Sequence, residues 1–309
     1  MLGINLLKRL DQIMAQSYPS GGWMDKKTSF DFIYEAAKDY AKKTRCLYTT
    51  QSITTVASQA NYALNPDFQE ILSENQDDAV KVLKYTDAAC NVSWMEQQLY
   101  GNQYYQNNTT AVDIPSKFAI IGRATMSRLT GTATSAGSQS GGESNLTDTA
   151  GDFTNAQAGD EVYNSTQGNM GVVLSKTSST VLVTAMFDVS GSSSAYDGWA
   201  QSDGYVIQPA PRYDLYLDPP PSTASETVTV PYVQRPAPVY SDYGSYNFAA
   251  GNEEALLKYA VWLYKYRDSK PQVGDALYKY YDMAVREASA SHRLATGKRT
   301  FQVSWKKNG

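Results

Sequence analysis

The chain has 309 residues, a formal net charge of −4 and 42% hydrophobic residues, which suffices for one large core or two domains. Its two cysteines, Cys46 and Cys90, provide no disulfide framework and no metal-ligand spacing, and we expect free thiols in a reducing compartment. No apolar run approaches the roughly 20 residues of a membrane span, and no charged leader precedes an apolar run, so neither a membrane protein nor a secreted one is expected.

Charged residues are unevenly distributed along the chain, and tyrosine is unusually frequent. Between Leu129 and Ile207 stand eight acidic residues and one basic residue, Lys176, so this segment carries −7 and the rest of the chain +3. Tyrosine accounts for 24 residues against 8 phenylalanines. Because tyrosine combines a large contact area with a polar tip, this composition favours partly hydrated interfaces, although core and strand positions account for many of them.

The first part of the chain mixes helical and strand patterns. Ile4–Ala15 predicts an amphipathic helix, and a second helix is expected from Thr28 or Ser29 to about Lys43. Further along, Val92–Tyr100 is interpreted as a short helix. Strands are predicted at three places, Ser52–Val56, Asn61–Leu64 and Val80–Tyr85, and again at Lys117–Arg123.

The composition changes abruptly at Leu129. Gly, Ser, Thr and Ala dominate as far as about Gly204, and turn pairs such as Gly159-Asp160 and Gly168-Asn169 recur at short intervals. Many short strands with close turns predict a small barrel or sandwich. Afterwards strand patterns resume at Tyr205–Gln208, Tyr213–Leu217 and Thr227–Val233.

A helical hairpin is predicted near the C-terminal end. Asn252–Arg267 has an N-cap candidate, acids in its first turn and a base in its last. Its polar residues Glu254, Lys258 and Lys265 form one narrow strip, and apolar side chains occupy most of the remaining circumference, so we expect other helices or neighbouring subunits to enclose it. Pro271 is well placed to begin a second helix.

These patterns predict an α+β protein: a helix-bundle-rich core with a small antiparallel sheet, plus an inserted all-β barrel or sandwich domain. The expected units are residues 1–128 (core, first part), 129–207 (insert), 208–291 (core, second part, with the hairpin) and 292–309 (extended tail). Lys117–Arg123 and Tyr213–Leu217 should share one sheet, which would bring the ends of the insert close together. Replacing the insert by a short linker should then leave a folded core.

Catalytic chemistry finds little support. The single histidine, His292, stands beside Arg293 in a basic segment, with no nucleophile that the sequence pairs with it. Asp160-Glu161, or Asp67 with Glu70, could form a general acid–base pair for glycan cleavage, but turn and capping roles explain them better. No phosphate-binding loop, dinucleotide fingerprint or metal-ligand cluster is present. We therefore predict no enzyme, no cofactor and no metal.

The insert has aromatic residues that allow two interpretations. They could form a platform that stacks on a glycan, or they could fill the small core: Tyr163, Phe187, Tyr196 and Trp199. The acidic surface of the insert would repel DNA.

Three stretches resemble the phage head-to-tail adaptor family: Thr55–Phe68 (TVASQANYALNPDF), Tyr213–Pro221 (YDLYLDPPP) and Tyr232–Pro236 (YVQRP), with the helical hairpin following in order. The resemblance covers Asn5–Arg128 and Ile207–Ala288, and the insert departs from the family pattern. It implies a ring, usually of twelve copies, that lies beneath the portal protein and continues the DNA channel to the tail nozzle or tail tube.

On this basis we expect a structural virion protein, assembled in the host bacterial cytoplasm. Its partners would be the portal protein, a tail nozzle or tail tube protein, neighbouring adaptor subunits and genome DNA passing through the lumen without sequence specificity, with no membrane. The hairpin would supply the subunit interface: Tyr259, Trp262, Tyr266 and Tyr280. Alternatives are a tail-associated adhesion protein whose insert binds a host glycan, and a cell-wall hydrolase.

The C-terminal tail is predicted to bind the portal. Phe301, Val303 and Trp305 alternate with polar residues, which is a strand period and suits addition to the sheet edge of a partner. The segment also has five bases and no acid: Arg293, Lys298, Arg299, Lys306 and Lys307. The resemblance implies that this segment reaches the portal, and the alternative is a solvated, frayed terminus.

Overall fold

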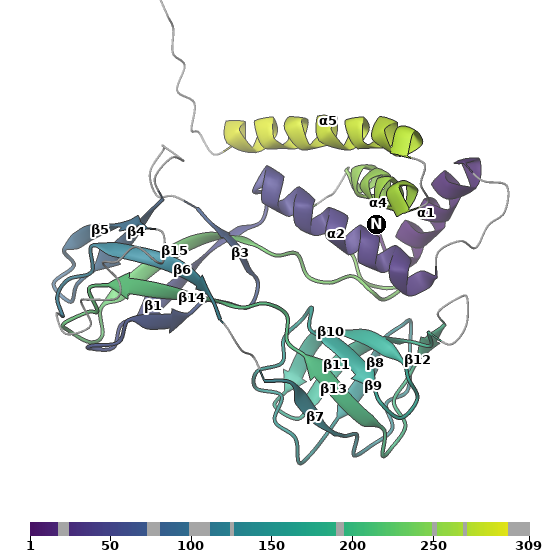
Figure 1. Cartoon of the computed structure of the whole chain (residues 1–309), viewed down its shortest axis with the longest axis horizontal. Helices are drawn as coiled ribbons and strands as arrows, with labels where there is room; N and C mark the ends of the chain where they lie inside the picture. The colour runs from purple at the N-terminus through teal and green to yellow at the C-terminus, as the bar shows by residue number, and fades with distance from the viewer. Residues whose placement is uncertain are drawn as a thin grey trace, which may run out of the picture.

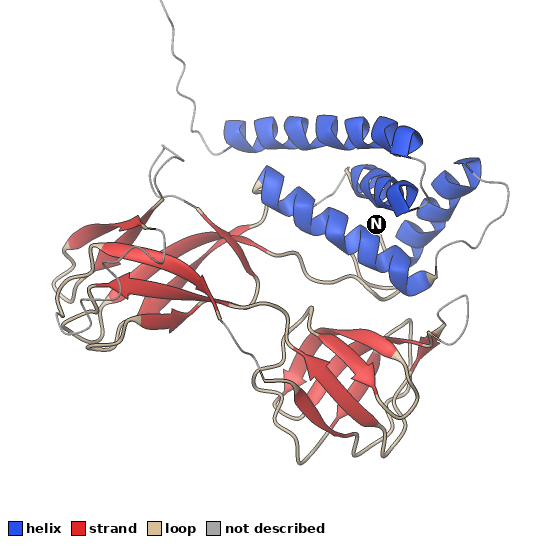
Figure 2. Cartoon of the chain, in the orientation of Figure 1, coloured by secondary structure: helices blue, strands red, loops and turns tan. Residues whose placement is uncertain are grey.

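A computed structural model describes residues 1–17, 25–72, 81–98, 112–123, 127–189, 195–248, 252–267 and 271–295. The described chain forms a layer of four helices beside two separate barrel-like sheets of eight and seven strands (Figures 1 and 2). The expected helix-bundle-rich core with a small sheet is therefore wrong, because most of the regular structure is β. Periodicity had located most strands, but it does not show how many of them join into one sheet.

The first sheet is organised around β15 (Thr227–Gln234). One edge of β15 pairs with β1 (Tyr48–Thr54), and its other edge is shared by β4 (Val82–Thr86) and β3 (Phe68–Ile71). From β4 the sheet continues through β5 (Val92–Gln97), β6 (Lys117–Gly122) and β14 (Tyr213–Asp218) to β2 (Asn61–Ala63). The Gln51 carboxamide then joins the two end strands, donating to the Ala63 carbonyl at 3.1 Å and accepting from Asn65 N–H at 2.9 Å.

Two sequence predictions about this sheet have opposite outcomes. β6 and β14 pair antiparallel from Lys117↔Asp218 to Gly122↔Tyr213, which confirms that they share one sheet. The short helix expected from Val92 is wrong, because Val92–Gln97 is strand β5 and pairs with β4 through a tight hairpin. Asp87 fixes that turn by accepting from Asn91 N–H at 2.8 Å. The paired strand therefore outweighs a weak helical pattern.

The second sheet is formed by residues 129–208, which nearly coincide with the expected insert. Its order is β12 (Tyr196–Asp197), β11 (Val181–Phe187), β10 (Met170–Ser178), β9 (Glu161–Asn164), β13 (Gly204–Gln208) and β7 (Leu129–Thr132), with β8 (Ser144–Thr147) on β11. A bridge between Ser135 and Thr147 brings the chain after β7 against β8 and so closes the barrel. Leu129 pairs with Ile207, which confirms that the ends of the insert lie close together.

The helical layer consists of α1 (Gly3–Ser17), α2 (Lys26–Thr44), α4 (Glu253–Arg267) and α5 (Pro271–Ala295). α4 is enclosed as expected, since Leu256, Leu257, Ala260 and Val261 are fully buried among the other helices. One member of its predicted polar strip departs from the pattern: Lys265 is 1% exposed. α2 begins at Asp25, whose carboxylate accepts from Thr28 N–H at 2.7 Å, so the cap lies three residues before the expected one. No helix among the described residues is both long enough and apolar enough to cross a membrane.

The insert packs directly on the helical layer. Along β11, Leu182 and Met186 point into the barrel of the insert, whereas Ala185 and Phe187 belong to the core shared with the helices. The Phe187 ring lies 6.4 Å, centroid to centroid, from the rings of both Phe30 on α2 and Tyr240. Because the end of β11 is buried on both faces, its last three residues, Ala185, Met186 and Phe187, are all apolar instead of alternating.

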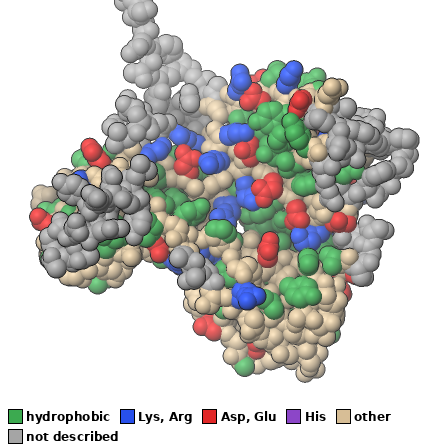
Figure 3. Space-filling view, viewed as in Figure 1, with side chains coloured by type: hydrophobic (Ala, Val, Ile, Leu, Met, Phe, Trp, Pro, Cys, Tyr) green, Lys and Arg blue, Asp and Glu red, His purple; other side chains and the backbone are tan. Residues whose placement is uncertain are grey.

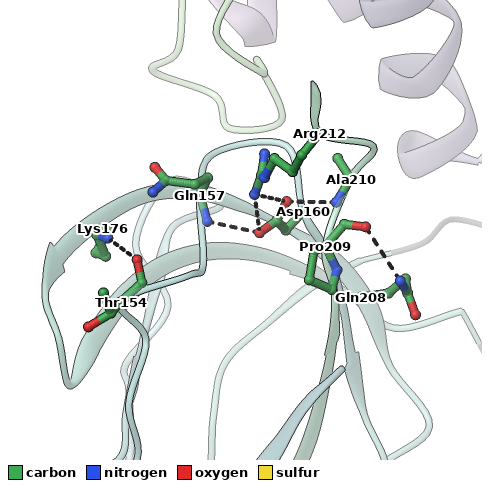
Figure 4. A network of polar contacts seen from close by, with 8 residues as sticks. All are labelled: Thr154, Gln157, Asp160, Lys176, Gln208, Pro209, Ala210 and Arg212. Carbon is green, nitrogen blue, oxygen red and sulfur yellow. Dashed lines mark hydrogen bonds and ion pairs between the residues drawn. The ribbon is translucent and has the colours of Figure 1, made fainter. Parts of the chain in front are cut away.

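A buried ion pair fixes the point where the chain leaves the insert (Figure 4). Arg212 Nη2 contacts both Asp160 oxygens, at 2.9 and 3.0 Å, and the same carboxylate accepts from the backbone N–H groups of Gln157 and Ala210, both at 2.8 Å. Burial raises the pKa of Asp160 and lowers that of Arg212, while these hydrogen bonds and the opposite charge offset the cost. Asp160 therefore has a structural role, holding the 157–160 turn against the strand that returns to the first sheet.

Candidate assembly surface

The hairpin formed by α4 and α5 is built around stacked aromatic rings. Tyr259 lies 5.0 Å from Trp262 and 4.7 Å from Tyr281, and Trp262 lies 4.8 Å from Tyr278, all measured between ring centroids. Such tilted pairs are each worth about 0.5–1.5 kcal/mol beyond the area they bury. The stack fixes how α5 lies on α4.

Polar side chains of α2 contact this aromatic stack and hold it in place. The Tyr281 hydroxyl donates to Asp39 Oδ2 at 2.6 Å, and Lys43 Nζ is 2.7 Å from the same carboxylate and 5.5 Å from the Tyr281 ring centroid. Burial and the adjacent Asp39 carboxylate both raise the pKa of Tyr281. Burial alone would lower the pKa of Lys43, but the hydrogen bond and charge of Asp39 outweigh it and leave that pKa raised. α5 is thus held on α2 by a neutral tyrosine and a charged lysine.

The outer side of the same hairpin exposes large apolar side chains. Tyr266 is 53% exposed, Tyr280 58% and Met283 57%. Tyr280 and Met283 are three residues apart and therefore share one face of α5, while the inward face has Leu277, Tyr281 and Val285. In Figure 1, α5 forms the outermost layer of the helical part. The exposed face of α5 thus combines two large apolar side chains with charged residues such as Lys279 and Glu287, a mixture that fits a partly polar protein–protein contact.

The four residues predicted for the subunit interface lie on this hairpin but differ in exposure. Tyr259 and Trp262 are half-buried in the aromatic stack, whereas Tyr266 and Tyr280 face outward. Sequence reasoning missed Met283 on the outer face. The signal for Met283 was its spacing of three residues from Tyr280, which places both side chains on one face of the helix.

The predicted portal-binding tail lies almost wholly outside the described residues. Arg293 belongs to the last turn of α5, and Lys298, Arg299, Phe301, Val303, Trp305, Lys306 and Lys307 follow beyond the end of the description. The lone histidine, His292, also falls in that last turn. The structure thus places the start of the tail at the end of the exposed hairpin.

The carboxylates considered as acid–base pairs have structural partners. Asp67 accepts from the Tyr232 hydroxyl at 2.8 Å and from Gln234 Nε2 at 2.5 Å, and Glu70 faces Arg45 at 3.6 Å. Glu161 lies exposed on β9 beside the buried Asp160. Neither pair presents two carboxylates to a common cavity. Among the described residues no group of three or more His, Cys, Asp or Glu side chains could hold a metal ion.

The aromatic residues of the insert are not gathered on one surface. Phe187 is buried against the helices and Trp199, 3% exposed, lies in the core of the insert itself. Tyr196 is fixed between the two parts, since Lys26 Nζ lies 3.9 Å from its ring centroid and its hydroxyl donates to Asp242 at 3.0 Å. Of these four residues, Tyr163 is the one that faces solvent, with 39% of its surface exposed. The second interpretation, as core residues, fits three of them.

The structure thus combines a helical hairpin that exposes apolar side chains with two barrel-like sheets. Residues 6–140 match the family model described as SU10 adaptor protein, and the matched region is less than half of the chain. A search of curated proteins found no match. The family match confirms the resemblance to the phage head-to-tail adaptor family.

This family defines the general role of the chain. The match suggests a phage structural adaptor, a virion component that associates with other capsid or tail proteins, and a structural protein instead of an enzyme.

Proposed function

We propose that this chain forms a ring, of twelve copies, that joins the portal protein to the tail nozzle or tail tube and continues the DNA channel. The observation that carries the proposal is the outer face of the hairpin, where Tyr266, Tyr280 and Met283 remain more than half exposed after the chain has folded. Neighbouring copies would bury this face, and a stable contact would cover more than about 1,000 Å² in total. The family match supports a role in head-to-tail joining.

Within this proposal the chain is organised as a core of residues 1–128 and 208–291, interrupted by the 129–207 insert. Genome DNA would pass through the lumen without sequence specificity. The insert, with its net charge of −7, would face away from the channel because its field repels phosphates. The basic segment from Arg293 to Lys307 would reach the portal and add a strand to an edge of its sheet.

The test is assembly of the purified chain on portal rings, followed by native mass spectrometry and negative-stain imaging. The double variant Tyr280→Ala, Met283→Ala should fold with an unchanged melting temperature, because both side chains face solvent, yet it should fail to form rings on the portal. Tyr48→Ala is the matched control, since Tyr48 is also 58% exposed but lies on the first sheet.

Rings of normal subunit number from the double variant would refute the hairpin interface. A discrete trimer without the portal would instead favour the adhesion alternative.

A further inference from the structure

A cavity of about 510 Å³ lies where the first sheet, the insert and the helical layer meet. Its walls come from the β2–β3 turn, the Gln157–Ala158 turn of the insert, the Gln234–Pro238 linker after β15 and the Ser245–Phe248 segment before α4. Figure 3 shows side chains of both charges in the middle of the drawn face of the molecule. The volume falls in the range of small-molecule and side-chain pockets, roughly 300–1,000 Å³.

Arg235 contributes a guanidinium to the wall without a carboxylate to pair with it. Its side chain is half-buried, and none of the described residues makes an ion pair with it. Asp67 also lines the cavity, but its two oxygens already accept from the Tyr232 hydroxyl and from Gln234 Nε2. Both oxygens of the Asp67 carboxylate are therefore hydrogen-bonded to residues of the first sheet.

A second guanidinium lies behind the first. Arg212 is 5% exposed, and its Nη1 is buried with no hydrogen-bond partner in the part of the chain that the structure describes. Burial is the main cause that lowers the pKa of Arg212, and the nearby positive charge of Arg235 lowers it further. The negative charge of Asp160 acts in the opposite direction. Arg212 and Arg235 thus lie near two carboxylates, Asp160 and Asp67, so the region has no net excess of charge. Asp160 pairs with Arg212, and Asp67 is hydrogen-bonded within the first sheet, which leaves the Arg235 guanidinium without a carboxylate partner among the described residues.

The rest of the lining indicates which anion fits. A guanidinium binds a carboxylate through two parallel N–H···O bonds. The carboxamide of Gln157 supplies a further donor, while Leu47, Pro236 and Phe248 provide apolar wall. A carboxylate on a short aliphatic stem satisfies both the charge and the apolar surface.

We propose that this junction cavity binds a carboxylate ligand, with Arg235 as its principal partner, and that the bound ligand ties the three layers of the molecule together. The ligand is either a free dicarboxylate or an acidic side chain of another virion protein. This site is independent of the ring interface, because none of its lining residues lies on α4 or α5.

The experiment is isothermal titration calorimetry on the whole chain at constant ionic strength, with succinate as the free dicarboxylate and hexaglutamate as the acidic peptide. Arg235→Gln removes the charge while keeping a similar side chain, and we expect at least a tenfold loss of affinity. Arg9→Gln is the control, since Arg9 is half-exposed on α1 and pairs with Glu254. Gln157→Glu is a second variant, which places a negative charge in the wall and should weaken binding without removing Arg235.

Saturable binding to the unaltered chain that is lost in both cavity variants and kept in the control supports the site. Binding of succinate then identifies a free dicarboxylate, and binding of hexaglutamate alone identifies an acidic side chain within a polypeptide. If neither probe binds, or if both cavity variants bind as well as the unaltered chain, the proposal is wrong.

Discussion

Phe187 provides the sharpest test of how the insert is joined to the rest of the molecule. The residue belongs to β11 of the insert, yet its side chain is fully buried in the core shared with the helices. Its ring contacts Phe30, Tyr196 and Tyr240, with centroids 5.2–6.4 Å away. Phe187→Ala should therefore cost about 3–5 kcal/mol of unfolding free energy, as buried phenylalanine truncations do.

The regions that lose hydrogen-exchange protection show whether Phe187 joins the insert to the helices or only contributes to overall stability. Urea denaturation gives the size of the effect, and hydrogen exchange with mass spectrometry shows where protection is lost. In Phe187→Ala, α2 and the segment around Tyr240 should lose protection, while the barrel strands of the insert retain most of theirs.

Phe153→Ala is the matched control. Phe153 is also fully buried, but it packs on Tyr205 inside the insert, with ring centroids 5.5 Å apart. Phe153→Ala should lower the hydrogen-exchange protection of the strands of the insert and leave that of α2 unchanged. If the two variants lose protection in the same places, or if Phe187→Ala costs less than about 1 kcal/mol, the two parts do not share a core in the way described here.

The shared core also changes the expectation for deleting the insert. Sequence reasoning expected a linker in place of residues 129–207 to leave a folded core. Removing the insert would uncover Phe30, Tyr34 and Tyr240 together. The structure therefore predicts that the deletion destabilises the helical layer unless these side chains are replaced by polar ones.

Three further predictions concern alkaline pH, the buried ion pair and the tail. Burial raises the pKa of Tyr34 and of Tyr232 to about 12, so each contributes stability that is fully present below pH 10 and lost as pH rises through 12. The native circular dichroism should therefore be lost near pH 12 together with the last part of the rise in tyrosinate absorbance, and ionisation of all the tyrosines near pH 10 in a still folded chain would contradict this. Arg212→Met should lower the free energy of unfolding, measured by urea denaturation, by about 3–5 kcal/mol, because it leaves the buried Asp160 carboxylate unpaired. Arg9→Met, at an exposed ion pair, should lower it by less than about 1 kcal/mol, and equal losses in the two variants would refute this reasoning. Removing Lys298–Gly309 should leave a folded protein that no longer docks on DNA-filled, portal-bearing heads, and full docking by that truncation would exclude the tail as the portal contact.

The sequence by itself determined several of the local elements. Acids in the first turn and apolar side chains around most of the circumference located α4, and Pro271 marked the start of α5. Closely spaced turns indicated the β structure of the insert, where Gly159 and Gly168 adopt φ of 92° and 81°. These signals are local, because capping, helical period and positive φ depend on a few neighbouring residues.

The tertiary structure alone decided how those elements share partners. β15 pairs with three strands, and β11 packs on two cores with alternate side chains, and neither arrangement leaves a distinct period in the sequence. Val92–Gln97 became a strand because β4 lay beside it. Likewise Arg212 finds its buried partner 52 positions earlier, at Asp160. Pairing across such distances follows from burial of the whole chain, so no window of sequence contains it.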